Sequence, residues 1–532
     1  MELSVVGNSQ GLAVCRSELA IHGELRRFTV PSRGRVCFLR TDWAKNLARS
    51  GVKASLKDAQ PTPMRSNELR DLGSASSRSD SVDRVRLFVG LPLDTVSDDQ
   101  TINHARAVTA GLKALKLLGV EGIEMPLWWG IVEKEAMGQY NWSGYLELAE
   151  MVQDAGLKLH VTLCFHASSY PKIKLPDWVI KIGESQPDMY FKDRSGKQYP
   201  DCLSFSIDEL PVLAGKTPVQ VYREFCESFN STFSAFMDST ITGITMGLGP
   251  GGDLKYPSHK EAKNGTISSA GEFQCYDKNM LALLKQSAEE AGNPLWGNGG
   301  PHDAAIYNQN PTSTNFFKDH GGSWESPYGK FFLNWYSTQL ISHGNRLLSM
   351  ASTIFKERSV SVYGKVPLMH SWYKTRSHAS ELAAGFHNTE INNGYDAVAK
   401  MFEQNSCKMI MPGIDLVDED QPKELRSSPE LLLTQVRTAC LNHGVGIAVQ
   451  NCGISKSGLE KMRANLSKDR TDLFMYQRMG AEFFSPEHFP AFTQFVWSLG
   501  QAEIHPDDLP QAKEQVAGSG KVSSSAEFFS PE

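Results

Sequence analysis

Three short apolar runs near the start of the chain decide the fold. They read VRLFVGL at residues 85–91, GIEMPL at 122–127 and LHVTLCF at 159–165. Each run has the length and apolar character of a buried strand, and Pro92 ends the first one. We therefore expect three strands at the start of the globular part of the chain.

The segments between these runs have helical periodicity. Val108, Leu112 and Leu115 fall on one face of a helix, and a second helix is predicted at 144–155. A regular alternation of strands and helices is the order of a parallel sheet whose strands are joined by helices.

The same rhythm continues to residue 476. Five more strand-like runs lie at 241–248, 360–369, 407–411, 445–449 and 473–476. Eight strands favour a closed barrel over an open sheet, so we expect the α/β class and a (β/α)8 TIM barrel. The stretches 166–240 and 250–335 are predicted as long loop insertions after strands 3 and 4. Both start at the carboxyl ends of strands, where barrel enzymes build their sites.

The composition and charge of the chain disfavour several classes of partner. The chain has 532 residues, 40% of them hydrophobic, with a net charge of −6 and a pI near 6.2. This charge does not favour nucleic acid or an anionic membrane as a partner. No apolar run approaches the roughly 20 residues that a membrane span needs.

The two ends of the chain differ from the middle. Residues 1–82 are rich in Ser and Arg and lack an unbroken apolar segment, so we expect a plastid transit peptide with a disordered arm; an arm without targeting function is the alternative. The barrel is expected to span 83–505, followed by a disordered polar tail at 506–532. The tail ends in AEFFSPE, which repeats residues 481–487.

The cysteine pattern offers no metal or redox motif. Nine cysteines are scattered without a C-x-x-C pair or zinc spacing. Ordinary reduced thiols are the favoured interpretation, and a regulatory disulfide is the alternative. We therefore predict no metal.

Polar and aromatic residues follow several predicted strands. Aromatic rings can pack on the apolar faces of sugars while polar groups bind sugar hydroxyls. Any one of these residues is more often structural, but their clustering at strand ends favours a carbohydrate cleft. The set is Trp128, Trp129, His166, Lys365, His370, Trp372, Tyr373, Gln450, Asn451 and Arg478.

Longer motifs make the resemblance specific. The run GPGGDLKYPS at 249–258 resembles GPAGELRYPS, the acid motif of plant β-amylases, glycoside hydrolase family 14. GEFQCYDK at 271–278, FFLNWYS at 331–337 and ELAAGFHN at 381–388 resemble further blocks of that family. The resemblance extends over residues 85–497 and implies the same barrel.

The resemblance also implies a chemistry. The family releases maltose from the non-reducing ends of α-1,4-glucans with inversion. Inversion needs two carboxyl groups about 6.5–9.5 Å apart, one as acid and one as base. The acid position matches Asp253, where the family has the longer Glu, and the base position matches Gln450, where the family has Glu. An amide cannot accept the water's proton, and losing a general base costs on the order of 10²–10⁴ in rate.

The mobile loops of the family are altered as well. His166 to Tyr170 replaces the family's flexible loop and lacks its substrate-binding aspartate. Pro412 stands where the inner loop of the family has a threonine that contacts substrate, and Pro126 matches another aspartate. Loops that close over substrate exclude water and complete the site, so we expect closure to be impaired.

Other positions keep the family's binding residues. They are His166, Lys365, His370, Asn451 and Arg478. Their retention is consistent with weak binding of an α-glucan or starch, and equally with a need of the fold.

Two functions remain. The favoured one is a catalytically inactive β-amylase-like protein of starch degradation in the chloroplast, with a regulatory, scaffold or glucan-binding role. The family's pathway suggests another starch-degrading enzyme as its partner. The alternative is a slow β-amylase that uses Asp415, Asp418 or Glu419 as its base. A gene-regulatory role is disfavoured because no added DNA-binding domain is visible. Neither the residues nor the family implies a cofactor.

Overall fold

The computed structural model describes residues 85–259, 270–307, 309–466 and 471–500. The predicted transit peptide and arm at 1–82 lie outside the described residues. The predicted tail at 506–532 does so too. The bounds given above for these segments therefore stay predictions.

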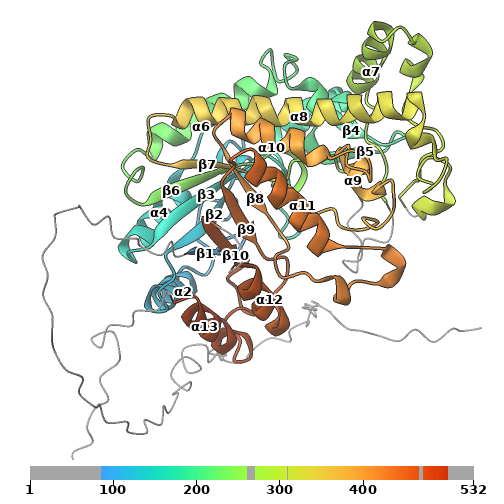
Figure 1. Cartoon of the computed structure of the whole chain (residues 1–532). Helices are drawn as coiled ribbons and strands as arrows, with labels where there is room; N and C mark the ends of the chain where they lie inside the picture. Colours follow the sequence, from blue (N-terminus) through green and yellow to red (C-terminus); the bar gives the residue numbers. More distant parts are fainter. Residues whose placement is uncertain (1–84, 260–269, 308, 467–470, 501–532) are drawn as a thin grey trace, which may run out of the picture. The chain divides into compact units, whose positions relative to one another are not determined.

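Eight parallel strands form a closed barrel, which confirms the predicted (β/α)8 architecture (Figure 1). Around the barrel the strands follow one another in the order β1, β10, β9, β8, β7, β6, β3, β2. Their bounds are β1 Arg86–Gly90, β2 Gly122–Trp128, β3 Lys158–Cys164, β6 Ile241–Met246, β7 Ser361–Lys365, β8 Lys408–Met411, β9 Ile447–Gln450 and β10 Leu473–Tyr476. The run predicted as a strand at 360–369 therefore ends early, because Pro367 has no N–H to donate to the sheet.

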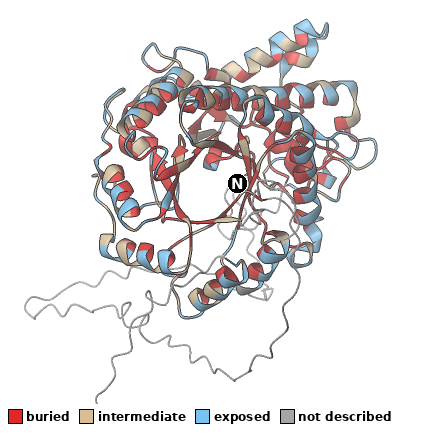
Figure 2. Cartoon of the chain, turned by 60° about the vertical axis from the view of Figure 1, so that its left-hand side comes forward, coloured by how far each residue is buried: buried red, intermediate tan, exposed pale blue. Residues whose placement is uncertain are grey.

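Helices surround the barrel and turn their buried sides toward it, as the red inner and blue outer faces in Figure 2 show. The predicted apolar face of the first one is confirmed, since Val108, Leu112 and Leu115 of α2 are buried. The helices are α2 Ala105–Leu117, α3 Trp129–Val132, α4 Ser143–Asp154, α5 Asp177–Ser185, α6 Pro218–Thr232, α7 Lys278–Glu290, α8 Pro327–Phe355, α9 Ala379–Ala384, α10 Gly394–Gln404, α11 Pro429–Asn442, α12 Lys456–Leu466 and α13 His488–Ser498. No helix among the described residues is long and apolar enough to cross a membrane.

The lower part of the barrel interior is filled by apolar side chains. One buried cluster contains Phe88, Tyr363, Ile410, Ala448, Leu473 and Met475. Side chains alternate between the two faces of a strand, so the next inward-facing positions toward the carboxyl ends lie above this cluster. On four of these strands those positions are Lys365, Pro412, Gln450 and Gln477. The barrel interior thus changes from apolar to polar within one layer of side chains.

Two long excursions leave the carboxyl ends of β3 and β6. The first contains α5 and a two-stranded antiparallel sheet of β4 Tyr190–Lys192 and β5 Gln198–Leu203. The second contains α7. The predicted spans 166–240 and 250–335 were too long, because the barrel helices α6 and α8 begin inside them. Both helices start with a capping residue followed by proline, at Thr217-Pro218 and Ser326-Pro327.

Asp277 connects the two excursions. It precedes α7, and its carboxylate accepts the backbone N–H groups of Asn279 and Met280. The same carboxylate accepts the hydroxyls of Ser204 and Ser206 from the first excursion, each at 3.0 Å. Because Asp277 is fully buried, these bonds also satisfy a charge that water cannot reach.

Candidate functional site

A cavity of about 470 Å³ opens at the carboxyl ends of the strands, above the apolar cluster. We call it the strand-end cavity. It has the size of an ordinary small-molecule site, about 300–1,000 Å³. Its wall combines carboxylate, guanidinium, ammonium, amide and indole groups, among them Glu124, Trp128, Thr162, His166, Lys365, Pro412, Gln450, Asn451, Gln477 and Arg478.

The structure brings most of the predicted site residues together here. His166, Lys365, Gln450, Asn451 and Arg478 line the strand-end cavity, and they come from the ends of four strands, β3, β7, β9 and β10. Asp253 and His370 are not among the lining residues. Asp253 nonetheless lies beside the cavity, because it forms a backbone bridge and a salt bridge with Lys365.

Asp253 is held between two lysines. One carboxylate oxygen lies 2.8 Å from Nζ of Lys255, and the other lies 3.4 Å from Nζ of Lys365. Burial acts to raise the pKa of Asp253, but the two ammonium groups outweigh it and hold the pKa below its ordinary value. The side chain is therefore a carboxylate at neutral pH, without a proton to donate.

Gln450 ends β9 and is buried. Its Nε2 lies 3.7 Å from the sulfur of Met475, the residue beside it in β10. The neighbouring Asn451 is bound to backbone groups. Its Nδ2 donates to the carbonyls of Gly453 and Gln477, and its Oδ1 accepts the N–H of Gln477 at 2.7 Å. These contacts favour a structural role for Asn451, which joins the ends of β9 and β10.

The two predicted histidines are both neutral at pH 7. Burial lowers the pKa of His166 to about 4, although the nearby Asp253 carboxylate opposes the shift. The ring of His166 meets Trp128 edge to face at 5.2 Å, and its buried Nδ1 has no partner among the described residues. Burial also lowers the pKa of His370, whose backbone carbonyl accepts the N–H of Ser428.

The paired tryptophans have different places. Trp128 lines the strand-end cavity and donates its indole N–H to the carbonyl of Leu93. Trp129 is fully buried and packs against Phe165, Trp178 and Tyr222. The expectation that both belong to a carbohydrate cleft is therefore wrong for Trp129, because it is the first residue of α3, is fully buried and does not line the cavity.

Sequence reasoning missed Glu124 and Gln477. Glu124 is 3% exposed in the middle of β2, and its Oε1 accepts the hydroxyl of Thr162 at 2.6 Å. Its Oε2 accepts Nε2 of Gln477 at 3.3 Å and lies 3.7 Å from Nη1 of Arg478. The sequence held a signal for Glu124, because it is a charged residue inside an otherwise apolar strand. It also stands four residues before Trp128, and alternate residues of a strand face the same side.

The three carboxylates suggested as a substitute base lie outside the strand-end cavity. Asp415 accepts the backbone N–H groups of Cys452 and Gly453 at 2.7 and 2.9 Å. Asp418 accepts the hydroxyl of Ser428 and pairs with Lys374. Glu419 is exposed. None of the three lines the strand-end cavity.

The loop after β3 turns back on itself. Ser168 and Ile173 exchange two backbone hydrogen bonds of 2.8 and 2.9 Å, which leaves Tyr170 at the tip with 90% of its surface exposed. This loop borders the strand-end cavity on one side and Pro412 borders it on another.

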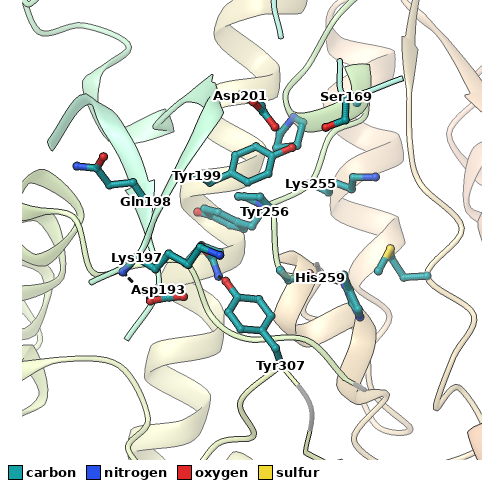
Figure 3. Close-up of a pocket in the computed structure, with 16 residues that line it drawn as sticks. Ser169, Asp193, Lys197, Gln198, Tyr199, Asp201, Lys255, Tyr256, His259 and Tyr307 are labelled. Carbon is teal, nitrogen blue, oxygen red and sulfur yellow. Dashed lines mark hydrogen bonds between the residues drawn. The ribbon is translucent and has the colours of Figure 1, made fainter. Parts of the chain in front are cut away.

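A second cavity, of about 630 Å³, adjoins the first (Figure 3). We call it the outer cavity. Side chains of the β4–β5 sheet form one wall, among them Lys197, Gln198 and Tyr199, while Lys255 and Tyr307 come from the second excursion. The two cavities share Ser169, Tyr199, Asp201 and Gly251.

Comparisons with known proteins agree with this architecture. Residues 88–501 match the profile of Glycosyl hydrolase family 14. The chain is 53% identical to "Inactive beta-amylase 9" of Arabidopsis thaliana, over 98% of each chain. It is 39% identical to "Beta-amylase 2, chloroplastic" of Oryza sativa subsp. japonica, over 82% of this chain and 80% of that protein.

A solved structure is similar over the same region. It is the catalytic domain of β-amylase from Paenibacillus polymyxa, with a TM-score of 0.65 and 26% identity, covering 78% of this chain and 98% of that one. The shared barrel, the excursions from its carboxyl ends and the match over most of the chain lead to one conclusion: this chain belongs to glycosyl hydrolase family 14.

Proposed function

We propose that this protein is a β-amylase-like member of starch metabolism that does not hydrolyse α-glucans and acts as a regulatory, scaffold or glucan-binding protein. Gln450 is the observation that carries this proposal. An inverting hydrolase needs a carboxylate to take the proton of the attacking water, and Gln450 places an amide at the matching position. An amide can orient a water molecule but cannot deprotonate it at neutral pH.

The state of Asp253 supports the same conclusion from the other side of the reaction. A general acid must hold its proton at the working pH, and enzymes raise the pKa of such a carboxyl. Lys255 and Lys365 act in the opposite direction on Asp253. The site then has neither an acid that can protonate the leaving oxygen nor a base that can deprotonate the attacking water.

Glucan binding is proposed for the strand-end cavity and its outer neighbour. Trp128 offers an aromatic wall, and Lys365 and Arg478 offer donors for hydroxyls. The substrate-binding roles of His166, Lys365, His370, Asn451 and Arg478 remain proposals. The strand-end cavity opens into the outer cavity, so a bound chain of several sugar units has room to extend outward.

The proposed setting is the plastid. A relative at 39% identity is named chloroplastic, and the Ser- and Arg-rich residues 1–82 are consistent with a transit peptide. A partner among starch-degrading enzymes is proposed because a protein without its own hydrolysis acts on starch through another enzyme. The relative at 53% identity is itself named inactive, which supports the non-hydrolytic reading over a slow β-amylase.

Maltose release from soluble starch tests the proposal. The purified full chain is compared with Gln450→Glu and with the double variant Gln450→Glu/Asp253→Glu, each checked for folding by circular dichroism. We expect no release by the unaltered chain and none by Gln450→Glu, because the acid remains an ionised carboxylate. In the same samples, isothermal titration with maltotriose measures glucan binding.

Release of maltose by the unaltered chain above a mock preparation would overturn the proposal. The slow β-amylase would then be favoured, with the anomeric form of the product reporting whether the reaction inverts. Activity in the double variant alone would support the proposal, because it would show that the two substitutions are what silences the site.

A further inference from the structure

The floor of the strand-end cavity holds a carboxylate whose hydrogen-bonding capacity is only partly used. Glu124 accepts one hydrogen bond on Oε1 from Thr162 and a longer one on Oε2 from Gln477. An ionised carboxylate has about four acceptor sites, so acceptor capacity remains on a group that faces the cavity. Burying a carboxylate is costly unless its acceptor sites are filled, which favours a ligand that donates to it.

Two further polar atoms of the same wall point to a ligand. His166 is 8% exposed, lines the cavity and has no partner for Nδ1 among the described residues. Oε1 of Gln477 is likewise buried without a partner there, although Nε2 of the same amide is bound to Glu124. The cavity therefore presents hydrogen-bonding atoms with unused capacity from three side chains beside the donors of Arg478 and Lys365.

The charges of the wall select a neutral ligand. Glu124 lies 3.7 Å from Arg478, and Lys365 lies 3.4 Å from Asp253, so each charge has an opposite neighbour. An anion would meet Glu124 and a cation would meet Arg478, whereas a polyhydroxyl compound can donate to the one and accept from the other. Trp128 adds the apolar surface that a sugar ring covers.

The position of Glu124 along β2 determines how deep in the cavity a ligand that binds it would lie. Glu124, Pro126 and Trp128 all face the cavity, because alternate residues of β2 point the same way. Glu124 lies two residues below Pro126, which corresponds to about 6.6 Å along a strand. Below it the apolar cluster that includes Phe88 and Tyr363 closes the barrel, so the end of a chain fits this floor and the middle of a chain does not.

We propose that Glu124 is the hydroxyl-accepting residue of a sugar subsite on the floor of the strand-end cavity, which takes the terminal ring of a neutral α-glucan. The proposal rests on the proposed glucan-binding function and deepens it. Gln477 and Arg478 position the carboxylate and bind the same ring, and His166, which follows the neighbouring strand β3, contacts the ring beside Trp128.

The test is isothermal titration of maltotriose into the full chain and into Glu124→Gln. A Gln side chain keeps the size and the acceptor for Thr162 but loses the charge. Hydrogen bonds to charged groups are strong, so we expect affinity to fall about ten- to hundredfold. Glu381→Gln is the matched control, because Glu381 is also fully buried and hydrogen-bonded, to Asn388 and Tyr395, but does not line the cavity.

Each outcome decides the matter. If the unaltered chain and Glu381→Gln bind while Glu124→Gln binds weakly, the subsite is supported. If Glu124→Gln binds as tightly as the unaltered chain, or if both variants weaken equally, the subsite is overturned while glucan binding stands. If the unaltered chain does not bind maltotriose, the proposed glucan binding fails and the subsite fails with it.

A second variant guards against misfolding of Glu124→Gln. A Cβ at Gly90 would lie 2.9 Å from both side-chain amide atoms of Gln477 and 3.0 Å from Oε2 of Glu124. Gly90→Ala therefore displaces the amide and the carboxylate from behind without removing either. We expect it to weaken maltotriose binding about tenfold in a chain whose circular dichroism is unchanged, and full affinity in that chain would contradict the subsite.

Discussion

At the scale of single residues, the contacts of Asp253 show that a carboxyl can be present without a proton to donate. A carboxyl is present at the predicted acid position, yet Lys255 and Lys365 keep it ionised. A shorter acid that is paired with two cations stabilises the local structure instead of donating a proton. A carboxyl that stands at the predicted acid position is thus placed in a structural ion pair by its neighbours.

This arrangement predicts how Lys255→Met behaves. The pKa of Asp253 is depressed in the folded chain, so the pair contributes stability above the unfolded pKa near 3.8 and loses it as pH falls through the folded pKa. Removing the closer ammonium group should lower the free energy of unfolding at pH 7 by about 1 kcal/mol. The deficit should shrink in acid.

Urea unfolding at pH 7 and at a series of lower pH values measures this effect. Lys255→Arg serves as the control, because it keeps the positive charge beside Asp253. Equal stability of Lys255→Met and the unaltered chain across the series would contradict the pairing.

Several residues of the strand-end cavity could be predicted, because parallel strands bring their carboxyl ends to one edge. His166, Gln450 and Arg478 were placed there because they stand just after predicted strands, and Lys365 because it lies within one. Glu124 was missed, although it too lies within a predicted strand. The signal in the sequence was its charge within a strand, and the packed structure adds that the apolar filling of the barrel stops one layer below it.

At the scale of elements, the two excursions are held together by Asp277. Asp277→Ala should remove the cap of α7 and leave Ser204 and Ser206 without their acceptor. Loss of a cap costs about 1 kcal/mol, and loss of a hydrogen bond to a buried charged group costs 1.5–3 kcal/mol, so we expect a decrease of about 3 kcal/mol in the free energy of unfolding.

Asp277→Asn is the control, because its amide oxygen still caps the helix. Chemical denaturation of both variants measures the difference. If Ala and Asn at this position are equally stable, the carboxylate does not connect the excursions as the structure indicates.

The bounds of these excursions were predicted less well than the strands. Long polar insertions obscure the periodicity from which helices are recognised, and α6 and α8 were absorbed into them. The capping residue and proline at 217–218 and 326–327 mark the true starts. Local capping chemistry was therefore the better guide to where the barrel resumes.

At the scale of the whole molecule, the closed barrel was predicted from the count of eight strands. The pH dependence of its stability, by contrast, depends on contacts that only the packed structure shows. Glu133 is fully buried, and its Oε2 accepts the indole N–H of Trp129 at 2.6 Å. Burial raises the pKa of Glu133 to about 7, partly offset by hydrogen bonds from Gly138 and Trp129.

The sign of the effect follows from linkage. A raised folded pKa contributes stability that is complete below the unfolded value near 4.5 and is lost as pH rises through about 7. Between about pH 5 and 8 the unaltered chain should therefore lose on the order of 2–3 kcal/mol relative to Glu133→Gln. Denaturant midpoints of both proteins over this range measure it, and parallel pH profiles would refute it.

The folded-back loop after β3 bears on how fast a ligand can exchange with the cavity. The N–H of Ala167 donates to the carbonyl of Asp201 at the base of this loop, and the Ser168 and Ile173 hydrogen bonds keep its tip folded, so we do not expect it to swing across the cavity mouth as a closing lid does. Lid motions take microseconds to milliseconds and trap a ligand until they reverse. If the cavity binds glucan as proposed, a bound chain end exchanges at the rate of its own dissociation, and the occupancy of the cavity follows the concentration of free chain ends without lag.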